Sequence, residues 1–501
     1  MNTFLIRGLG FFNGSYDLFV MNVVNVLLKE QYGPLVYTTN MKSAVSAAAL
    51  IGAAVGQLLF GILGDIFGRK NNMIATCTIL IVGGVLCTCA YGGTPSRTLW
   101  FLVAARGLLG IGVGGEYPLA ASTMAEDAKS VTERNYRVAM TFSLQGVASL
   151  LASILGNLLV EALANEPKGE NQTRRIELVW RLLFAIGVLP ACVLCYHRIT
   201  AQETCVFRAV QARRQAVAVA HNERLRRVSF RFILKHYGWG LLGTAGTWFL
   251  FDIVFYAQNL FSATILSVVG VKDASLQQIT TQNAFVALMA LPGYYVAVFF
   301  INSVGRKAIQ LQGFAVMTVL FLCLATLWDD LKHNAVAFIL LFGLALFFSN
   351  FGPNMSTFIL PTEMFPTAIR STCHGLSAAC GKAGAAIGSF GFGLWVESKS
   401  LGYAGTFFIF AGITLVSIPL TWFCVFDSEQ SLEDLDEEFF ERVQEERYLG
   451  LDSFAMNAKD ASAELAAMME AHQYQQLQLP RQSGSGGGGI GSYKVAVTPS
   501  S

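Results

Sequence analysis

Long apolar stretches recur along the whole chain, and each is roughly 18 to 25 residues long, enough to cross the ~30 Å hydrocarbon core of a bilayer. A helix is expected for each stretch, because in an apolar environment a single segment can satisfy its backbone hydrogen bonds only within itself. The composition agrees, since 53% of residues are apolar, 14% are charged and the mean hydropathy is +0.50. The sequence therefore predicts an all-α membrane protein with twelve transmembrane helices, at 8–28, 43–63, 72–91, 98–122, 138–162, 178–197, 238–265, 279–301, 308–328, 335–355, 371–395 and 402–426.

A basic segment without any long apolar run divides these helices into two six-helix bundles. The predicted organisation is a first bundle at 1–197, a basic central loop at 198–237, a second bundle at 238–426 and a tail at 427–501. The halves echo each other, because Gly64-Asp65-Ile66-Phe67-Gly68-Arg69-Lys70 follows the second span and Asn302-Ser303-Val304-Gly305-Arg306-Lys307 follows the second span of the other half. Repeated halves around a midplane site are typical of secondary transporters.

The placement of Lys and Arg predicts the orientation of the chain in the membrane. If the amino terminus is cytoplasmic, the loops on that side, with the central loop 198–237 foremost, hold most of the Lys and Arg in connecting segments. Positive charge favours the cytoplasmic side. We therefore expect both termini in the cytoplasm and a plasma-membrane location, with an internal organelle membrane as the alternative. The sequon at Asn171 then falls in an external loop and is open to glycosylation.

The tail differs abruptly in composition from the rest of the chain. It is acidic from Asp427 onward, a short helix is predicted to open at 428–438, and a Gly/Ser run follows at 483–492. Such sequence cannot bury enough apolar surface to order itself. We expect a solvated cytoplasmic extension, with a regulatory arm as the alternative.

One carboxylate, Asp252, lies in the middle of a predicted span. An ionisable group at that depth is costly and is a functional candidate by default. Trp248 and Tyr256 lie four residues before and after it, so the three side chains share one helix face. This face is predicted to form a polar binding wall. The alternative is that both aromatic residues only pack or face lipid.

Several motifs carry a resemblance to a known family. Gly64-Asp65-x-x-Gly68-Arg69-Lys70 is similar to the cytoplasmic gate signature of the major facilitator superfamily. Three longer stretches resemble motifs of the phosphate:proton symporters within that superfamily. They are Gly110-Ile111-Gly112-Val113-Gly114-Gly115-Glu116-Tyr117-Pro118-Leu119-Ala120, the run from Thr247-Trp248 to Leu260-Phe261, and the run from Phe351-Gly352-Pro353-Asn354 through Ser371-Thr372-Cys373-His374-Gly375 to Gly381-Lys382.

The resemblance implies a phosphate site built from both halves, at Tyr117, Gln145, Trp248, Asp252, Tyr256, Asn354 and Lys382. The chemistry fits independently, because a buried anion needs a cation and Lys382 is the one Lys or Arg inside the predicted spans of the second bundle. Asp252 repels phosphate unless it is protonated, which suggests proton coupling. Simpler roles are open: Asn354 can cap or kink a helix, Gln145 can join two helices, and Lys382 can reach toward a helix end.

A second set of charges in the first bundle is a candidate for proton coupling together with Asp252. Asp17, Arg106 and Glu116 are predicted to be buried, and pairing among them would lower the cost of burial. A purely structural network is the alternative. The candidate cytoplasmic gate comprises Gly64, Asp65, Gly68, Arg69, Lys70 and Arg306.

Three departures from the family motifs affect the predicted function. Glu116 replaces the usual Asp, as in glycerophosphodiester carriers of the wider family, Gly14 stands where a further Asp is common, and Asn302 replaces the Asp of the second gate. The expected function is proton-coupled import of inorganic phosphate by alternating access. A carrier of a phosphorylated organic solute and a transport-inactive phosphate sensor are the alternatives.

The expected partners are phosphate, protons and the lipid bilayer, with the monomer as the functional unit. The sequence suggests no cofactor, no metal, no nucleic-acid partner and no enzymatic activity, because it contains no nucleophile and base pair, no metal-ligand spacing and no nucleotide motif. Its ten cysteines lie mostly in the predicted spans, where we interpret them as small apolar packing residues.

Overall fold

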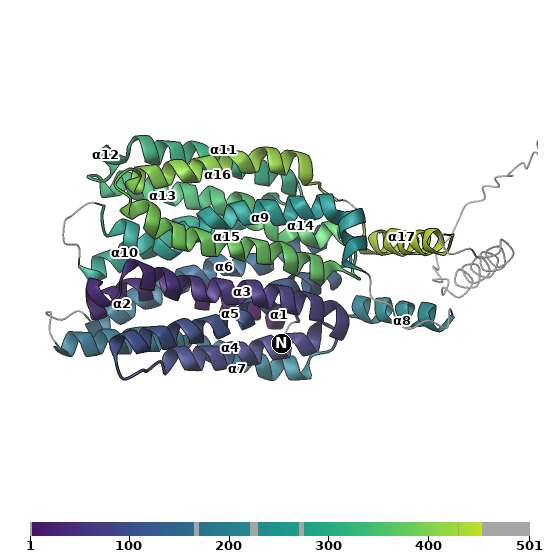
Figure 1. Cartoon of the computed structure of the whole chain (residues 1–501), viewed down its shortest axis with the longest axis horizontal. Coiled ribbons are helices and arrows are strands. Elements are labelled where there is room, and N and C mark those ends of the chain that lie inside the picture. The colour runs from purple at the N-terminus through teal and green to yellow at the C-terminus, as the bar shows by residue number, and fades with distance from the viewer. Residues whose placement is uncertain (1–2, 165–169, 221–228, 270–274, 429, 453–501) are drawn as a thin grey trace, which may run out of the picture. The chain divides into compact units, whose positions relative to one another are not determined.

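The computed structural model describes residues 3–164, 170–220, 229–269, 275–428 and 430–452, and the secondary structure in these residues is helical, without a strand. Figure 1 shows long helices lying side by side. The chain forms two compact units, residues 1–437 and residues 438–501. Within the described residues, the helices that are long and apolar enough to span a membrane all lie in the first unit. The second contains the later part of the last helix.

The helices follow one another along the described chain. In chain order the elements are α1 (Thr3–Phe19), α2 (Met21–Val36), α3 (Thr39–Phe67), α4 (Arg69–Thr88), α5 (Pro95–Glu126), α6 (Val131–Leu159), the π-helical η1 (Val160–Ala164), α7 (Glu170–Thr200), α8 (Cys205–Ala220), α9 (Phe230–Leu266), α10 (Leu276–Phe300), α11 (Arg306–Thr326), α12 (Trp328–Leu331), α13 (Ala335–Ser349), the π-helical η2 (Asn350–Asn354), α14 (Met355–Met364), α15 (Arg370–Glu397), α16 (Gly402–Cys424) and α17 (Leu432–Asp452).

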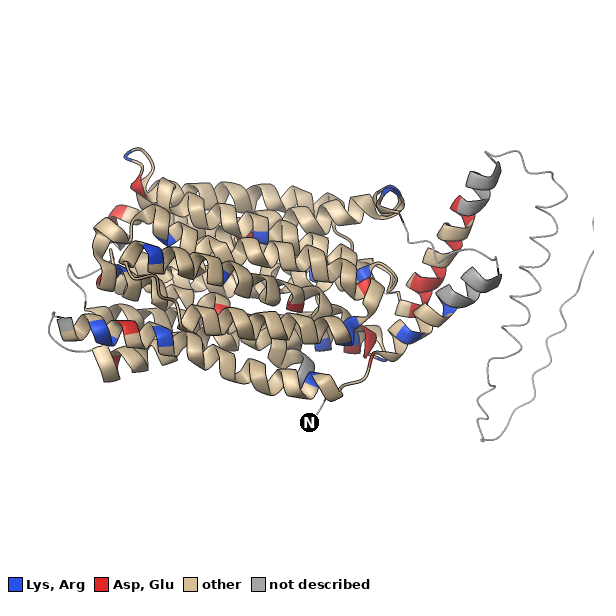
Figure 2. Ribbon diagram, turned by 60° about the horizontal axis from the view of Figure 1, so that its bottom comes forward, with Lys and Arg blue, Asp and Glu red and all other residues tan. Residues whose placement is uncertain are grey.

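Eleven segments of the described chain are long and apolar enough to cross a membrane, and they coincide with eleven of the predicted spans. The remaining predicted span corresponds to α15, whose 28 residues also exceed the roughly 20 needed to cross a bilayer. Helix α15 is less apolar than the other eleven segments, because its sequence is rich in Gly and Ser and contains Lys382. Figure 2 shows charged residues mainly toward the two ends of the helical unit, with only a few between them. This distribution fits helices that span a bilayer.

Glycine rows allow the central helices to approach one another closely. A Cβ atom on Gly384 would lie 2.1 Å from the carbonyl oxygen of Phe249, and one on Gly388 would lie 2.0 Å from that of Ile253. The backbones of α15 and α9 are therefore in direct contact. Gly52 and Gly56 bring α3 against α5 in the same way. These contacts hold the helices that carry the candidate site.

The two halves repeat the same construction at one end of the unit, which we call the gate end. Gly68 and Gly305 have φ angles of 90° and 91° and precede α4 and α11. Each of these values lies in the left-handed region that glycine adopts without steric cost. The arginine that follows each glycine binds a glutamate at the same sequence distance, Arg69 to Glu126 and Arg306 to Glu363.

The start of the tail is not the solvated appendage that its composition suggested. Asp427 accepts a hydrogen bond from the backbone N–H of Lys307 at 2.9 Å, as Glu203 does from that of Lys70 at 3.1 Å. Asp436 accepts one from the backbone N–H of Thr367 at 2.6 Å. The prediction was wrong for 427–437, because composition does not reveal which unpaired N–H groups the acidic residues can cap. The predicted helix is present as α17, while the Gly/Ser run 483–492 lies outside the described residues.

We predict that Gly388→Val destabilises the protein by about 1–3 kcal/mol, because the added side chain must push apart two packed backbones. Thermal unfolding of the purified protein in detergent measures the effect. Gly412→Val is the matched control, since Gly412 also lies within a spanning helix but a Cβ there meets nothing within 4 Å. Equal losses of stability in the two variants would contradict the proposed role of close packing between α9 and α15.

Candidate functional site

The centre of the candidate site is an ion pair between two helices of the second half. Lys382 on α15 lies 2.9 Å from Asp252 on α9, measured from Nζ to Oδ2. Both side chains are almost fully buried, with relative exposures of 1% and 2%. The glycine contacts between α9 and α15 explain this proximity, and Gly381 leaves room for the Trp248 ring beside Lys382.

Three aromatic rings surround the ammonium group of Lys382. The Nζ atom is 4.5 Å from the ring centroid of Tyr256, 4.8 Å from that of Tyr117 and 5.9 Å from that of Trp248. Distances of this size allow cation–π attraction. Tyr117 lies on α5, so the first half contributes directly to the site. The structure thus brings together five of the seven residues predicted to bind phosphate.

The other two predicted residues, Gln145 and Asn354, join this group through a tyrosine that the sequence interpretation missed. The amides of both donate to the hydroxyl oxygen of Tyr294, at 3.2 and 2.9 Å respectively. Gln145 also accepts from the Tyr117 hydroxyl at 3.4 Å. Tyr294 follows Pro292-Gly293 inside a predicted span, and a tyrosine at that depth is the signal that could have identified it.

A break in the tenth predicted span directs Asn354 toward Tyr294. Phe351 and Gly352 have non-helical backbone angles within η2, and Pro353 follows them. Proline supplies no backbone N–H and so favours a break at this point. The alternative role of Asn354 at a kink therefore coexists with its contact to the site.

A cluster of aromatic rings lies beside Tyr117 and Trp248. The ring of Phe358 on α14 is 4.5 Å from that of Phe142, 5.1 Å from Phe11 and 5.2 Å from His374, measured between centroids. Phe11 and Phe142 belong to the first half. These contacts fill the space between the halves next to the ion pair.

Asp17 and Arg106 lie together within the first half. Arg106 donates to the backbone oxygen of Asp17 at 3.3 Å, and Asn13 donates to the Asp17 carboxylate at 3.2 Å. Two residues after Asp17, the ring of Phe19 stacks on Tyr256 with 5.9 Å between centroids. Helix α1 thus connects this carboxylate to the wall of the candidate site.

Glu116 does not pair with Arg106 or Asp17, as the sequence interpretation had suggested. Its two carboxylate oxygens accept from the two terminal nitrogens of Arg198, each at 2.6 Å, and it also accepts from Thr76. A separation of ten residues places Arg106 about 15 Å further along the same helix and on a different side of it. Arg198 is part of α7, which continues to Thr200 and so extends beyond the predicted limit of the bundle.

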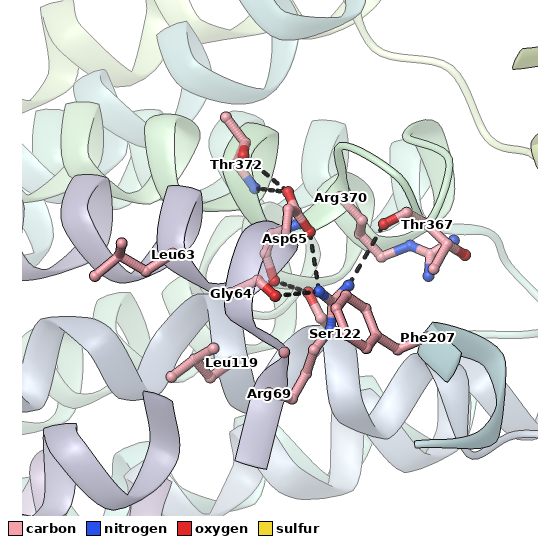
Figure 3. Close-up of polar contacts among 12 residues, drawn as sticks. Leu63, Gly64, Asp65, Arg69, Leu119, Ser122, Phe207, Thr367, Arg370 and Thr372 are labelled. Carbon is pink, nitrogen blue, oxygen red and sulfur yellow. Dashed lines mark hydrogen bonds and ion pairs between the residues drawn. The ribbon is translucent and has the colours of Figure 1, made fainter. Parts of the chain in front are cut away.

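Charged groups close the gate end between the halves (Figure 3). Asp65 at the end of α3 accepts from the backbone N–H and the hydroxyl of Thr372 on α15, each at 2.8 Å, and pairs with Arg69 at 3.1 Å. Arg69 pairs with Glu126 at 2.7 Å. It also donates to the backbone oxygen of Thr367 at 3.4 Å. A carboxylate at the amino end of α15 is also favoured by the helix dipole. Gly64 accepts from Arg69 through its backbone oxygen.

The corresponding contacts of the second half are less charged. Asn302 accepts from Asn135 at 3.2 Å and donates to the backbone oxygen of Thr132 at 3.3 Å, so amide hydrogen bonds replace a carboxylate here. Arg306 pairs with Glu363 at 2.8 Å and donates to the backbone oxygen of Ser428. Nearby, burial raises the pKa of Asp436. The positive charge of Arg370 acts in the opposite direction and lowers this pKa.

In the described residues, hydrogen bonds of Asn22 and Lys42 join the halves at the opposite end of the unit, which we call the far end. Asn22 on α2 donates to Ser262 at 2.6 Å and to Asn283 at 2.8 Å, and Lys42 on α3 donates to Thr264 at 2.6 Å. Hydrogen bonds between the halves therefore exist at both ends. The ion pair is buried between them. Within the described residues, no three His, Cys, Asp or Glu side chains gather as a metal site requires.

Comparison with known proteins places this arrangement in a family. The chain matches the family described as "Sugar (and other) transporter" over residues 3–231 and 241–439. It belongs to this transporter family. It is 36% identical to "Probable inorganic phosphate transporter 1-6" of Arabidopsis thaliana, covering 87% of this chain and 93% of that protein, and 36% identical to "Inorganic phosphate transporter 1-2" of Oryza sativa subsp. japonica, with the same shares covered.

Among solved structures, the major facilitator superfamily proton:xylose symporter XylE is similar in fold. The TM-score is 0.70 at 20% sequence identity, and the match covers 87% of this chain and 98% of that one. The predicted major facilitator fold and the predicted relationship to the phosphate transporters are thereby confirmed. The chain is an integral membrane protein.

We predict that Glu116→Gln lowers stability by about 3–5 kcal/mol, because it leaves the guanidinium of Arg198 buried without its charge partner. The double variant Glu116→Gln/Arg198→Met should recover much of this loss. Thermal unfolding in detergent of the four proteins of this double-mutant cycle tests the pair. Additive losses of stability would contradict a direct interaction between the two side chains.

Proposed function

We propose that this chain imports inorganic phosphate together with protons by alternating access. The observation that carries the proposal is the buried cation Lys382, held by Asp252 amid hydroxyl, indole and amide groups from both halves. A phosphate needs a positive charge and several hydrogen-bond donors in a buried site. The curated relatives named as inorganic phosphate transporters support this assignment.

The ion pair suggests how proton binding and phosphate binding are linked. In the structure, the Asp252 carboxylate accepts a hydrogen bond from the Lys382 ammonium group, which is the group that would bind phosphate. Protonation of Asp252 removes its negative charge, so Lys382 becomes available to the anion. Loss of the proton restores the internal ion pair and expels the phosphate. The two anions compete for one cation, and the proton decides which of them holds it.

Asp17 and Arg106 are the groups of the first half that we propose for coupling. Their contact within one bundle, and the stacking of Phe19 on Tyr256, provide a route by which protonation at Asp17 affects the substrate site. Glu116 can affect coupling only through its pair with Arg198, because both of its oxygens are engaged there.

We place the gate end, with Asp65, Arg69, Lys70 and Arg306, at the cytoplasmic side, together with both termini. The excess of Lys and Arg in the connections at that end supports this orientation. The plasma membrane is the proposed location. The monomer is the proposed functional unit, because one chain supplies both halves of the site.

The two alternative functions predict different assay results. An organic phosphate carrier was suggested mainly by Glu116, but this residue bonds to Arg198 and Thr76 and contacts none of the residues around Lys382 through a described hydrogen bond. Its longer side chain therefore supplies no argument for a larger substrate. The test is uptake of radiolabelled phosphate into proteoliposomes with an imposed pH gradient. Competition by unlabelled glycerophosphodiesters would favour the organic carrier, and failure to accumulate phosphate would favour the sensor.

We predict that Lys382→Ala abolishes phosphate binding to the purified protein, because it removes the only cation that contacts the site's aromatic groups in the described structure. Isothermal titration with phosphate measures this. The double variant Lys382→Ala/Asp252→Asn shows whether the loss arises only from an unpaired carboxylate. Lys332→Ala, at a partly exposed lysine that pairs with Asp329, is the control. Normal affinity in Lys382→Ala would refute the assigned site.

We predict that Asp252→Asn retains phosphate binding but does not accumulate phosphate against its gradient. Asparagine keeps the shape of the side chain but cannot carry the proton, so binding should also lose its dependence on pH in the range where Asp252 titrates. Uptake driven by a pH gradient and equilibrium exchange of labelled phosphate are compared in the same proteoliposomes. Accumulation equal to that of the parent protein would exclude Asp252 as the coupling group.

A further inference from the structure

A buried glutamine of the first half, Gln57 on α3, carries an amide group that is not bonded to any described residue. Its side chain is completely buried, with a relative exposure of 0%. Neither Nε2 nor Oε1 has a hydrogen-bond partner among the described residues. Buried polar groups are almost always hydrogen-bonded, because an unpaired group has lost its bonds to water without a replacement. The amide of Gln57 therefore lowers stability in this state and is free to bond a ligand.

Gln57 lies where α3 of the first half is in direct contact with α15 of the second half. A Cβ atom on Gly375 would lie 2.3 Å from the backbone oxygen of Gln57. A Cβ atom on Gly61 would lie 2.7 Å from the backbone oxygen of Ser371. The two halves therefore meet backbone to backbone at the turn of α3 that carries Gln57.

The face of α3 that carries Gln57 also contacts α5, the helix that carries Tyr117. A Cβ atom on Gly114 of α5 would lie 2.1 Å from the backbone oxygen of Ala53. Because Ala53, Gln57 and Gly61 are spaced four residues apart, they share one face of α3. The Gln57 side chain therefore extends between α5 and α15, which both supply groups to the ion-pair site.

The side chains of Gln57 and Lys382 lean toward each other, because α3 and α15 run in opposite directions and helix side chains lean toward the amino end. Helix α3 begins at the far end, so the Gln57 side chain leans away from the gate end. Helix α15 begins at the gate end, so the Lys382 side chain leans toward it. Lys382 follows Gly375 on the same face of α15 after two turns, about 10 Å along the axis. The amide and the ammonium group are thus directed into the space between these two levels.

The chemistry of an amide suits a protonated phosphate. Nε2 can donate to a phosphate oxygen, and Oε1 can accept from a P–OH group. The monoanion H2PO4⁻ offers both kinds of group. A side chain with one donor end and one acceptor end therefore complements the positive charge of Lys382, which cannot accept a hydrogen bond.

We propose that Gln57 is a further phosphate-binding residue, whose amide bonds the anion on the gate side of Lys382. The inference rests on the proposed phosphate transport. When phosphate replaces Asp252 as the partner of Lys382, Gln57 gains the bonds that it lacks among the described residues. This gain occurs only in the loaded protein, so it favours that state over the empty one.

Removal of the amide should weaken phosphate binding and raise stability, two changes that a structural glutamine would not combine. Gln57→Leu keeps the approximate size of the side chain but removes both polar atoms. We expect the Kd for inorganic phosphate, measured by isothermal titration of the full chain in detergent, to rise about tenfold, because hydrogen bonds to the anion are lost. We expect the unfolding temperature without phosphate to rise by about 1–3 °C, because an unpaired buried amide has been removed.

Gln258→Leu is the matched control. Gln258 is also completely buried and its Oε1 has no partner among the described residues, but it lies on a different side of α9 from Asp252. This variant should keep the parental Kd. An equal rise of the Kd in both variants, or an unchanged Kd in Gln57→Leu, would overturn the proposal. A lower unfolding temperature of Gln57→Leu would show that the amide stabilises the empty protein, and would overturn it as well.

Uptake of labelled phosphate into proteoliposomes separates a failure of this inference from a failure of the proposed function. If the parent protein takes up no phosphate, the proposed function fails and the role of Gln57 fails with it. If the parent takes up phosphate but Gln57→Leu keeps the parental KM and Kd, only the role of Gln57 is refuted.

Discussion

The buried ion pair between Lys382 and Asp252 is the interaction on which the rest of the structure depends. Removing two charges from water costs several kcal/mol for each ion, and their mutual attraction offsets this only with good geometry. Here the geometry requires two helix backbones in direct contact, which Gly384 and Gly388 permit. Close packing of α9 and α15 is therefore a condition of the electrostatics. Because this pair is costly to bury, another anion can easily replace Asp252 as the partner of Lys382, as a transporter requires.

The two ends of the helical unit are closed by different chemistry. Carboxylates and guanidinium groups such as Asp65 and Arg69 close the gate end, whereas amides and hydroxyls such as Asn22 and Ser262 form much of the far-end closure. Charged contacts that include helix ends are strong but need desolvated, fixed partners. Neutral contacts exchange more readily with water or with a substrate. This asymmetry is compatible with arrival of the anion at the far end and a firmer barrier at the gate end.

Much of the fold and part of the candidate site could be predicted from the sequence. Span lengths, the repeated gate motif and the i, i+4 spacing around Asp252 are local patterns, and physical rules connect them directly to helices and faces. Tyr294 and Arg198 were missed because their roles depend on contacts between distant helices. A tyrosine in a span has many possible partners, and an arginine at a helix end looks like a loop residue until the length of α7 is known.

The tail is a second region where the sequence did not reveal contacts between distant segments. Composition correctly indicated a polar segment with a helix. Asp427 is also the second half's counterpart of Glu203, because each accepts from the backbone N–H of the lysine two residues after a glycine with positive φ. The repeat therefore extends beyond the last span. An acidic residue that looks like the first residue of a solvated tail is instead bonded to the second half. Internal symmetry, once recognised at Gly68 and Gly305, would have predicted a carboxylate there where composition could not.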